Sequence, residues 1–498
     1  MDNGGAAILW RTAYFRHRIP ATQMKRIAVI NVVGLARGLM TESRMPTLTK
    51  WATSKSVTTI SPAFPAVTCT AQANYVTGKL PRDHGIVANG WYNRELAEVQ
   101  FWKQSNHLIQ APKVWDALRA ELPGFTCAKL FWWYNMYSTA DYSITPRPMY
   151  PADGRKVFDI YTWPFSIRAE IKKDIGEFPF PAFWGPAAGV DKQFKADAVS
   201  KWIAESAKWI ERKHRPTLSL IYLPHLDYNL QRLGPGAPEI SNDLRRIEAI
   251  TMDLIAFLEE QGVEPIILSE YGITPVNQPI HLNRIFREKG WLTVKEELGL
   301  ELLDAGAGKA FAVADHQVAH VYINDISVEG AVRRAIEELP GIERVLDERG
   351  KVEFGINHQR SGDLIAISKS NAWFTYYYWL EDAKAPDFAR TVDIHRKPGY
   401  DPVELFIDPA INFPMLKVAS KLLKKKLGFR MLMDLVPLDA TLVKGSHGRP
   451  SQDPAEQPVL IGPRQWGLSS LPIASTDVYD IIRGAFGASV SDPNTMAR

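Results

Sequence analysis

The sequence predicts an α/β fold with a doubly wound, mostly parallel sheet flanked by helices and with an inserted smaller α+β subdomain. Continuous apolar runs at 26–34, 218–223 and 265–269 are typical of strands that are buried on both faces. Amphipathic helical patterns at 195–213 and 242–261 separate these runs. Strands that alternate with helices form parallel sheets through βαβ crossovers. Catalytic groups in such sheets lie at the carboxyl ends of the strands.

The alternation of strands and helices stops in one long segment, which defines the expected subdomain. Strand-like patterns of a different spacing follow there, at 318–323, 364–368 and 373–380. We therefore expect 25–290 and 431–498 to form the core and 291–430 to form the inserted subdomain. Residues 1–24 lack a strand or helix pattern and are predicted to be an unstructured leader.

Composition excludes several classes of protein. The formal net charge is +4, from 59 Lys and Arg against 55 Asp and Glu, which is too weak over 498 residues to hold nucleic acid. Cys69 and Cys127 are the only cysteines, so the sequence has no disulfide framework and no cysteine-based zinc site. No apolar run reaches the roughly 18 residues that a membrane span needs. We expect a cytoplasmic protein without a stable membrane span.

A threonine stands at the start of a predicted helix between Pro65 and Gly78. Pro65 enforces an extended approach, and Gly78 ends the helix. Thr68 is thus expected at the helix N-terminus, where free amides and the helix dipole stabilise a phosphate or an alkoxide. A hydroxyl needs a base or a metal to become a nucleophile. Cys69 is the alternative nucleophile, because a helix N-terminus lowers the pKa of a thiol.

Segments 64–78 and 80–92 resemble the nucleophile helix and the following loop of type I phosphodiesterases/nucleotide pyrophosphatases, a branch of the alkaline phosphatase superfamily. The shared pattern is Pro-x-x-Thr…Thr-Gly-x-x-Pro-x-x-His-Gly-Ile-x-x-Asn. The resemblance implies that Thr68 attacks phosphorus and forms a phospho-enzyme, and that Asn89 donates to a phosphoryl oxygen. It further implies hydrolysis of phosphodiester or pyrophosphate bonds in a small-molecule phosphoester.

The family holds two zinc ions, and the first of these two sites is partly kept. Asp227 and His447 match two of its ligands by resemblance, whereas Gln231 stands where the family has a histidine. His225 lies two residues upstream of Asp227 and is the alternative third ligand if the local backbone differs.

The second zinc site is more strongly altered. Glu270 keeps a carboxylate, but Val33 replaces an aspartate and Tyr271 replaces a histidine. By resemblance we expect a single divalent ion, Zn, Mn or Mg. Asp227 and His447 would hold this ion, with Glu270 or His225 as a third ligand.

Three further residues are predicted to contact the substrate. Trp91 and Tyr92 lie just past Asn89 and either stack on a base or another flat leaving group or pack in the core. Arg396 lies in the charged loop 392–401 and is either a clamp for an anionic substrate or part of a salt-bridged turn.

Two other patterns leave alternatives open. His316 and His320 are four residues apart and are expected on one face of a strand, with structural hydrogen bonds or with a metal role. Residues 415–433 form a basic amphipathic helix, which is either solvated or docks on a membrane surface or a partner.

The sequence as a whole predicts a metal-dependent hydrolase with a threonine nucleophile. The alternative is a catalytically altered or inactive scaffold that serves as a binding or accessory protein in a biosynthetic pathway. The replaced metal ligands favour the alternative, whereas the intact nucleophile segment favours the enzyme.

Overall fold

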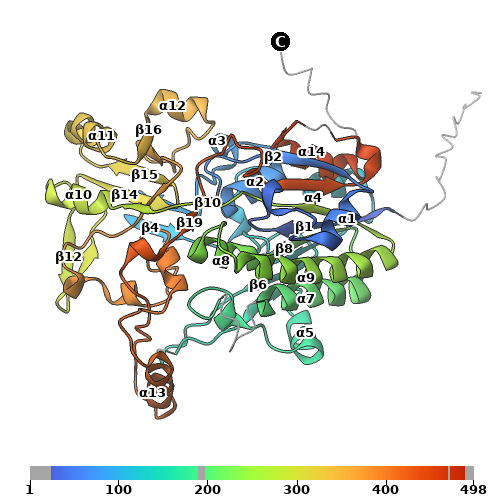
Figure 1. Cartoon of the computed structure of the whole chain (residues 1–498), viewed down its shortest axis with the longest axis horizontal. Coiled ribbons are helices and arrows are strands. Elements are labelled where there is room, and N and C mark those ends of the chain that lie inside the picture. Colours follow the sequence, from blue (N-terminus) through green and yellow to red (C-terminus); the bar gives the residue numbers. More distant parts are fainter. Residues whose placement is uncertain (1–23, 154, 189–196, 469–470, 488–498) are drawn as a thin grey trace, which may run out of the picture.

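The computed structural model of the chain describes residues 24–153, 155–188, 197–468 and 471–487. Within these residues, nine strands form one large sheet (Figure 1). Their spatial order is β21 (Ile473–Ala474), β2 (Ser56–Ser61), β20 (Val459–Gly462), β9 (Val263–Leu268), β1 (Arg26–Val32), β8 (Leu218–Leu223), β5 (Cys127–Leu130), β6 (Tyr142–Pro146) and β7 (Ile160–Trp163). The leader predicted for 1–24 falls, apart from its last residue, outside the described residues.

The centre of the large sheet is parallel, as predicted. β1 lies between β8 and β9 and pairs with both in parallel, and β5 and β6 continue the parallel ladder beyond β8. Only β20 and β7 run antiparallel to the strands they join among the described residues. All residues of β1 and β8 are buried, which explains their continuous apolar sequences. The predicted α/β fold class is confirmed.

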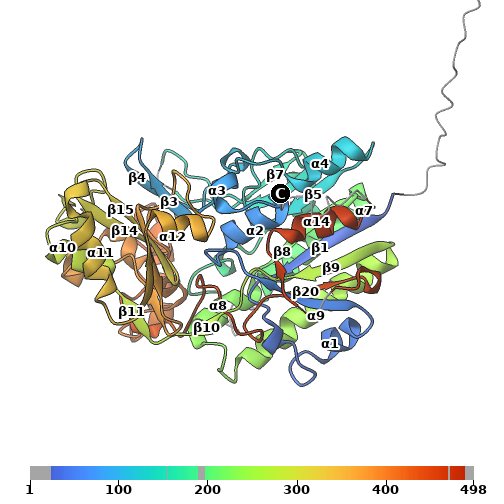
Figure 2. The same ribbon diagram turned by 90° about the horizontal axis from the view of Figure 1, so that it is seen from above.

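Helices cover both faces of the large sheet (Figure 1 and Figure 2). One face packs against α1 (Pro46–Ala52), α7 (Ala198–His214), α8 (His225–Leu233) and α9 (Ile240–Glu260). The other face packs against α2 (Thr68–Thr77), α4 (Val114–Glu121) and α14 (Asp477–Gly484). Two further helices are α3 (Pro81–His84) and α5 (Ile167–Ile175). The helices predicted at 195–213 and 242–261 are α7 and α9.

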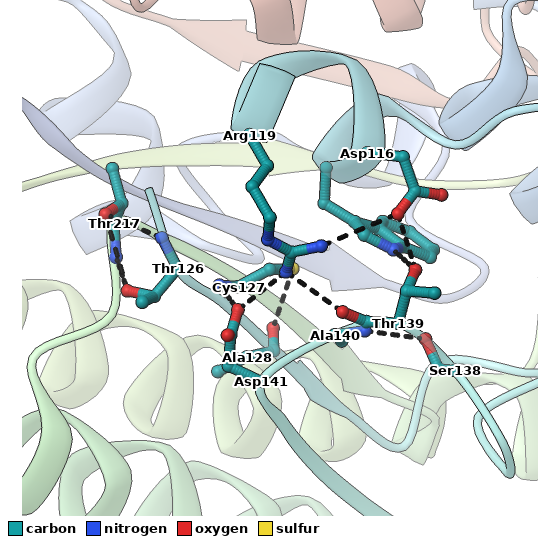
Figure 3. Close-up of polar contacts among 11 residues, drawn as sticks. Asp116, Arg119, Thr126, Cys127, Ala128, Ser138, Thr139, Ala140, Asp141 and Thr217 are labelled. Carbon is teal, nitrogen blue, oxygen red and sulfur yellow. Dashed lines mark hydrogen bonds and ion pairs between the residues drawn. The ribbon is translucent and has the colours of Figure 1, made fainter. Parts of the chain in front are cut away.

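A polar network fastens α4 to β5 and to the start of β6 (Figure 3). Arg119 donates to the carbonyl oxygen of Thr139 at 2.9 Å and to Asp141 Oδ2 at 2.8 Å. The same Asp141 oxygen accepts from the backbone N–H of Cys127 at 2.8 Å. Thr139 Oγ1 donates to Asp116 at 2.6 Å. Burial raises the pKa of the Cys127 thiol, and the side chain belongs to the core beneath α4.

A smaller unit with its own core lies beside the large sheet (Figure 1). Its antiparallel sheet has the order β14 (Ala310–Asp315), β15 (Val318–Ile323), β17 (Leu364–Ser368) and β16 (Ile342–Leu346). The helices of this region are α10 (Leu282–Glu288), α11 (Glu329–Glu337) and α12 (Glu348–Glu353). The bounds predicted for the strands at 318–323 and 364–368 are confirmed. The domain boundaries at 290 and 430 stay a prediction.

Four pairs of short strands connect or extend these units. They are β3 (Gly90–Asn93) with β4 (Glu98–Phe101), β10 (Thr274–Pro275) with β19 (Gly445–Ser446), β11 (Gln278–Ile280) with β18 (Ala372–Phe374), and β12 (Val294–Glu297) with β13 (Leu300–Leu303). The strand predicted at 373–380 was too long, because the chain leaves the ladder after Phe374 and buries the aromatic side chains of 376–379 in the smaller core.

The predicted basic helix is α13 (Pro414–Lys426). It is shorter than the predicted range 415–433, because Gly428 adopts a φ of +86° that helical residues do not.

Candidate functional site

Four residues from distant parts of the sequence line one cavity beyond the carboxyl ends of β8 and β9. Thr68 begins α2 and Asp227 lies in the first turn of α8, directly after β8. Tyr271 follows β9 and His447 follows β19. All four side chains line the same cavity. The predicted meeting of Thr68, Asp227 and His447 is found in the structure.

A chain of hydrogen bonds begins at the threonine hydroxyl. Thr68 Oγ1 lies 3.1 Å from the Tyr271 hydroxyl, which donates to Asp227 Oδ1 at 3.2 Å. With the Tyr271 proton directed to Asp227, the Thr68 hydroxyl can donate to Tyr271. Asp227 Oδ2 accepts from Gln231 at 2.8 Å, and Gln231 accepts from Tyr400 at 3.1 Å. The Tyr271 hydroxyl thus links the threonine to a carboxylate.

His447 is held as a neutral imidazole beside this chain. Its Nδ1 donates to the carbonyl oxygen of Ala66 at 2.7 Å, and burial lowers its pKa to about 3. The imidazole stacks on the Tyr271 ring with a centroid distance of 3.6 Å. Its Nε2 is 3.9 Å from Asp227 Oδ1, beyond hydrogen-bond distance.

Several residues that line the cavity carry buried polar atoms without a partner among the described residues. They are Trp133 Nε1, Tyr228 Oη, both ring nitrogens of His316, and His447 Nε2. Buried polar groups without a partner are rare in folded proteins, and their concentration in one cavity indicates a ligand site. Sequence reasoning missed Trp133 and Tyr228 in this role, since nothing in their local patterns distinguishes them from core aromatics.

The acidic side chains do not fit the metal sites implied by the resemblance. Both oxygens of Asp227 already accept hydrogen bonds, from Tyr271 and from Gln231. The Tyr271 ring also covers one face of the His447 imidazole. Across the described ranges, no group of three or more His, Cys, Asp or Glu side chains is arranged to hold an ion. The predicted alternative ligand His225 lies 3.3 Å from Asp243 and does not line the cavity.

Glu270, the predicted third ligand, is bound by amide groups. Its Oε1 accepts from Asn31 at 2.5 Å and from Gln72 at 2.6 Å. Burial raises the pKa of Glu270 to about 8, although the hydrogen bonds from Gln72, Asn31 and Thr68 oppose the shift. Burial likewise raises the pKa of Asp227 to about 7. Both carboxyl groups therefore exchange protons near neutral pH.

Asn89 stabilises the start of α2. Its side-chain oxygen accepts from the backbone N–H of Cys69 at 3.0 Å, and its amide group donates to Asp315 at 3.1 Å. Asn89 does not line the cavity, so its contacts do not support the predicted donation to a phosphoryl oxygen. Burial raises the pKa of the Cys69 thiol well above its usual range, which argues against Cys69 as the nucleophile.

The predicted substrate contacts divide into two groups. Trp91 and Tyr92 are buried outside the cavity, Trp91 under the guanidinium of Arg360 and Tyr92 against Phe311. The structure gives them the packing role and does not support stacking on a substrate. Arg396 lines a second, more open cavity and forms an exposed ion pair of 3.1 Å with Asp387.

The two histidines predicted on one strand face differ in position. His320 lies in β15 and is held by Val87 and Gly362, as expected for a structural histidine. His316 was wrongly placed on the same strand, because it occupies the turn before β15 with a φ of +62°. This turn directs His316 to the cavity, where its ring centroid is 3.6 Å from that of His447.

The raised carboxyl pKa values predict a stability that falls with rising pH. Glu270 and Asp227 bind protons more tightly in the folded than in the unfolded chain, so their contribution is full below about pH 4 and is lost through pH 7 to 8. Glu270→Gln keeps the acceptor for Asn31 and Gln72 and removes the ionisation. We expect it to raise the free energy of unfolding at pH 9, measured by urea denaturation, by a few kcal/mol as an order of magnitude. The exposed control Glu42→Gln should show the same dependence of unfolding free energy on pH as the native protein. If the stability of Glu270→Gln falls with rising pH as steeply as that of the native protein, the raised pKa of Glu270 is contradicted.

Comparisons with known proteins agree with this architecture. Murine ectonucleotide pyrophosphatase/phosphodiesterase 5 in complex with AMP superposes with a TM-score of 0.56 at 12% identity, covering 94% of this chain and 96% of that one. Phosphonoacetate hydrolase from Sinorhizobium meliloti 1021 in complex with phosphonoformate gives a TM-score of 0.58 at 14% identity with the same coverage. At these identities the two structures show a shared fold.

Sequence comparison supplies the family. An uncharacterized pyrophosphatase/phosphodiesterase of Schizosaccharomyces pombe is 25% identical over 236 residues, which span 45% of this chain and only 40% of that protein. Within the described residues no helix is long and apolar enough to cross a membrane. A family model described as type I phosphodiesterase/nucleotide pyrophosphatase matches residues 27–401, well over half of the 498 residues. The chain therefore belongs to the type I phosphodiesterase/nucleotide pyrophosphatase family.

Proposed function

We propose that this protein hydrolyses phosphodiester or pyrophosphate bonds with Thr68 as the nucleophile. The observation that carries the proposal is the hydrogen-bond chain from Thr68 through Tyr271 to Asp227 in a cavity with unpartnered polar atoms. Family membership supports the reaction class, and the AMP bound to the murine relative supports a small phosphoester as substrate.

The first step transfers the substrate's phosphoryl group to the threonine. Thr68 Oγ1 forms a bond to phosphorus while the bond from phosphorus to the leaving oxygen breaks. The Thr68 proton passes to the Tyr271 oxygen, and the Tyr271 proton passes to Asp227. Asp227 can accept it because its pKa of about 7 leaves the carboxylate ionised in neutral to alkaline solution.

Water completes the turnover. It attacks the phosphorus of the phospho-enzyme, the bond to Thr68 breaks, and the threonine oxygen regains its proton from Tyr271 as Asp227 returns the first one. The remaining water proton goes to solvent. The alkoxide that left in the first step takes up a proton from solvent. The single divalent ion implied by the resemblance stays a prediction, and because the donor set does not fit it, none of these steps passes through a metal.

Two donors in the cavity suit the phosphoryl oxygens. Trp133 Nε1 and the Tyr228 hydroxyl are buried, line the cavity and have no partner among the described residues. N–H and O–H groups fixed in a desolvated site stabilise negative charge that grows in the transition state. The N-terminus of α2 adds its positive dipole beside Thr68.

The second cavity suits an anionic extension of the substrate. Arg396 lines it together with Lys103 and Arg147, against one carboxylate, Asp393. Trp102 lines both cavities, so a substrate bound at Thr68 can reach the basic wall. This arrangement favours Arg396 as a substrate contact in addition to its exposed ion pair.

Removal of one hydroxyl tests the proposed route for the proton. Tyr271→Phe keeps the ring that stacks on His447 and removes the link between Thr68 and Asp227. We expect kcat for an aryl phosphodiester to fall by about a hundredfold or more while the melting temperature changes little. Activity of the native protein should survive dialysis against a chelator. Native turnover by Tyr271→Phe, or loss of activity on chelation that zinc restores, would contradict this route.

A binding or accessory protein is the second candidate. Tyr271 favours it, because its hydroxyl and ring stand between the nucleophile and the residues that match metal ligands. Calorimetry with AMP distinguishes the two candidates. Binding of AMP without turnover of any aryl phosphodiester, in the native protein at pH 6 to 9, would establish the second.

A further inference from the structure

The helix α13 stands away from the rest of the molecule (Figure 1). None of its residues is buried, although it contains Leu416, Leu422 and Leu423. The helix belongs to an arm formed by residues 408–435. The two ends of this arm lie together, where the backbone N–H of Asp408 donates to the carbonyl oxygen of Leu435 at 2.7 Å. Helices of globular proteins normally bury their apolar face. The stability of the core therefore does not explain these leucines.

The apolar face of α13 points outward. Lys417 and Lys421 bind Asp434, at 3.0 Å and 2.7 Å, and fix the inner side of the helix. Helical spacing puts Leu416, Leu423 and Leu427 on the opposite side. Eight of the twenty exposed large apolar side chains of the described residues belong to this arm, with exposures from 42% to 73%: Phe413, Met415, Leu416, Leu422, Leu423, Leu427, Phe429 and Leu432.

The charge of the arm is positive throughout. Between Asp408 and Asp434 the sequence has six Lys and Arg and no Asp or Glu. Lys424, Lys425 and Lys426 are exposed and have no ion-pair partner within the described part of the chain. A short helix that combines exposed leucines with unpaired lysines has the composition of helices that lie in the headgroup region of anionic bilayers.

We propose that α13 docks this protein on an anionic lipid bilayer. The leucine face enters the boundary between headgroups and acyl chains, and the lysines bind lipid phosphates. A helix of 13 residues is about 20 Å long and lies on a bilayer without spanning it. A second copy of the chain is a poor occupant of this face, because it would bring two sets of unpaired lysines together.

Docking would hold the active-site cavity at the membrane. Leu405 packs on Tyr228, which lines that cavity, and the arm begins three residues later at Asp408. The arm is thus attached to the wall of the cavity by a short, packed segment.

Vesicle flotation with the full chain tests the proposal. We expect the protein to float with vesicles of phosphatidylcholine and phosphatidylglycerol at low salt, less at high salt, and not with phosphatidylcholine alone. The triple variant of Lys424→Gln, Lys425→Gln and Lys426→Gln should bind about a hundredfold more weakly. The triple variant of Leu416→Ser, Leu423→Ser and Leu427→Ser should bind at least about tenfold more weakly.

Matched variants elsewhere on the surface serve as controls. Leu96→Ser with Leu298→Ser removes exposed leucines, and Lys369→Gln with Lys384→Gln removes exposed lysines, so both should float like the native protein. Absence of the native protein from anionic vesicles, or equal flotation of the leucine triple variant, would overturn the proposal. Light scattering that shows a dimer which the leucine variant dissolves would overturn it in favour of a second copy.

Discussion

Thr68→Ala is expected to lower kcat for an aryl phosphodiester by about a thousandfold or more, because it removes the hydroxyl to which the proposed function assigns the attack on phosphorus. Thr68 Oγ1 is the end of the hydrogen-bond chain through Tyr271 to Asp227. Thr68→Ser keeps the oxygen and should retain a measurable part of the activity. Steady-state kinetics with circular dichroism to verify folding provide the measurement.

A threonine at the other end of the same helix is the control for this substitution. Thr77 is buried like Thr68, but its hydroxyl donates within α2 to the carbonyl oxygen of Ala73. Thr77→Ala should therefore leave kcat near the native value. Native turnover by Thr68→Ala would exclude a covalent role for this residue and would favour the binding protein.

Lys397→Met is expected to lower the free energy of unfolding by about 3–5 kcal/mol, because it leaves two buried carboxylates without their cation. Lys397 Nζ lies 2.7 Å from Asp401 and 2.7 Å from Glu404, and all three side chains are almost fully buried. The carboxylates raise the pKa of Lys397 against the effect of burial, so the cation is kept. Glu404 also accepts from Trp184, which lines the active-site cavity.

Urea denaturation measures this loss, and two variants make it specific. Lys295→Met breaks an exposed ion pair with Glu297 and should leave the unfolding midpoint nearly unchanged. Adding Asp401→Asn and Glu404→Gln to Lys397→Met should restore most of the stability, because no unpaired charge then remains. If Lys397→Met alone is as stable as the native protein, the ion pairs of Lys397 with Asp401 and Glu404 do not stabilise this segment.

The sequence was sufficient for the large sheet and for the position of the nucleophile. Buried parallel strands are rich in consecutive apolar residues, and most residues of β1, β8 and β9 are apolar and buried. The helix of Thr68 was bounded by signals within a few residues of its ends, and Gly78 indeed has a left-handed φ of +65°. Such features depend on local backbone chemistry, which the sequence displays directly.

The site depended on contacts that no local pattern encodes. Tyr271 was recognised as a lost ligand, but the hydrogen bonds that its hydroxyl forms with Thr68 and Asp227 arise only when the segment after β9 meets the starts of α2 and α8. Likewise, Trp91 resembles a stacking platform in the sequence, yet it lies buried under Arg360. The sequence does not distinguish an aromatic residue that tertiary packing directs to a cavity from one that it directs to a core.

Rapid-quench mass spectrometry of the peptide that contains Thr68 tests the central claim most directly. Denaturation of the native protein in acid during turnover of a phosphodiester should trap an adduct in which Thr68 Oγ1 is bonded to the phosphorus of the substrate. The phosphorus in this adduct still carries the ester group that did not leave. The adduct should be absent from Thr68→Ala. Efficient hydrolysis by the native protein with an unmodified Thr68, at every quench time, would contradict the account.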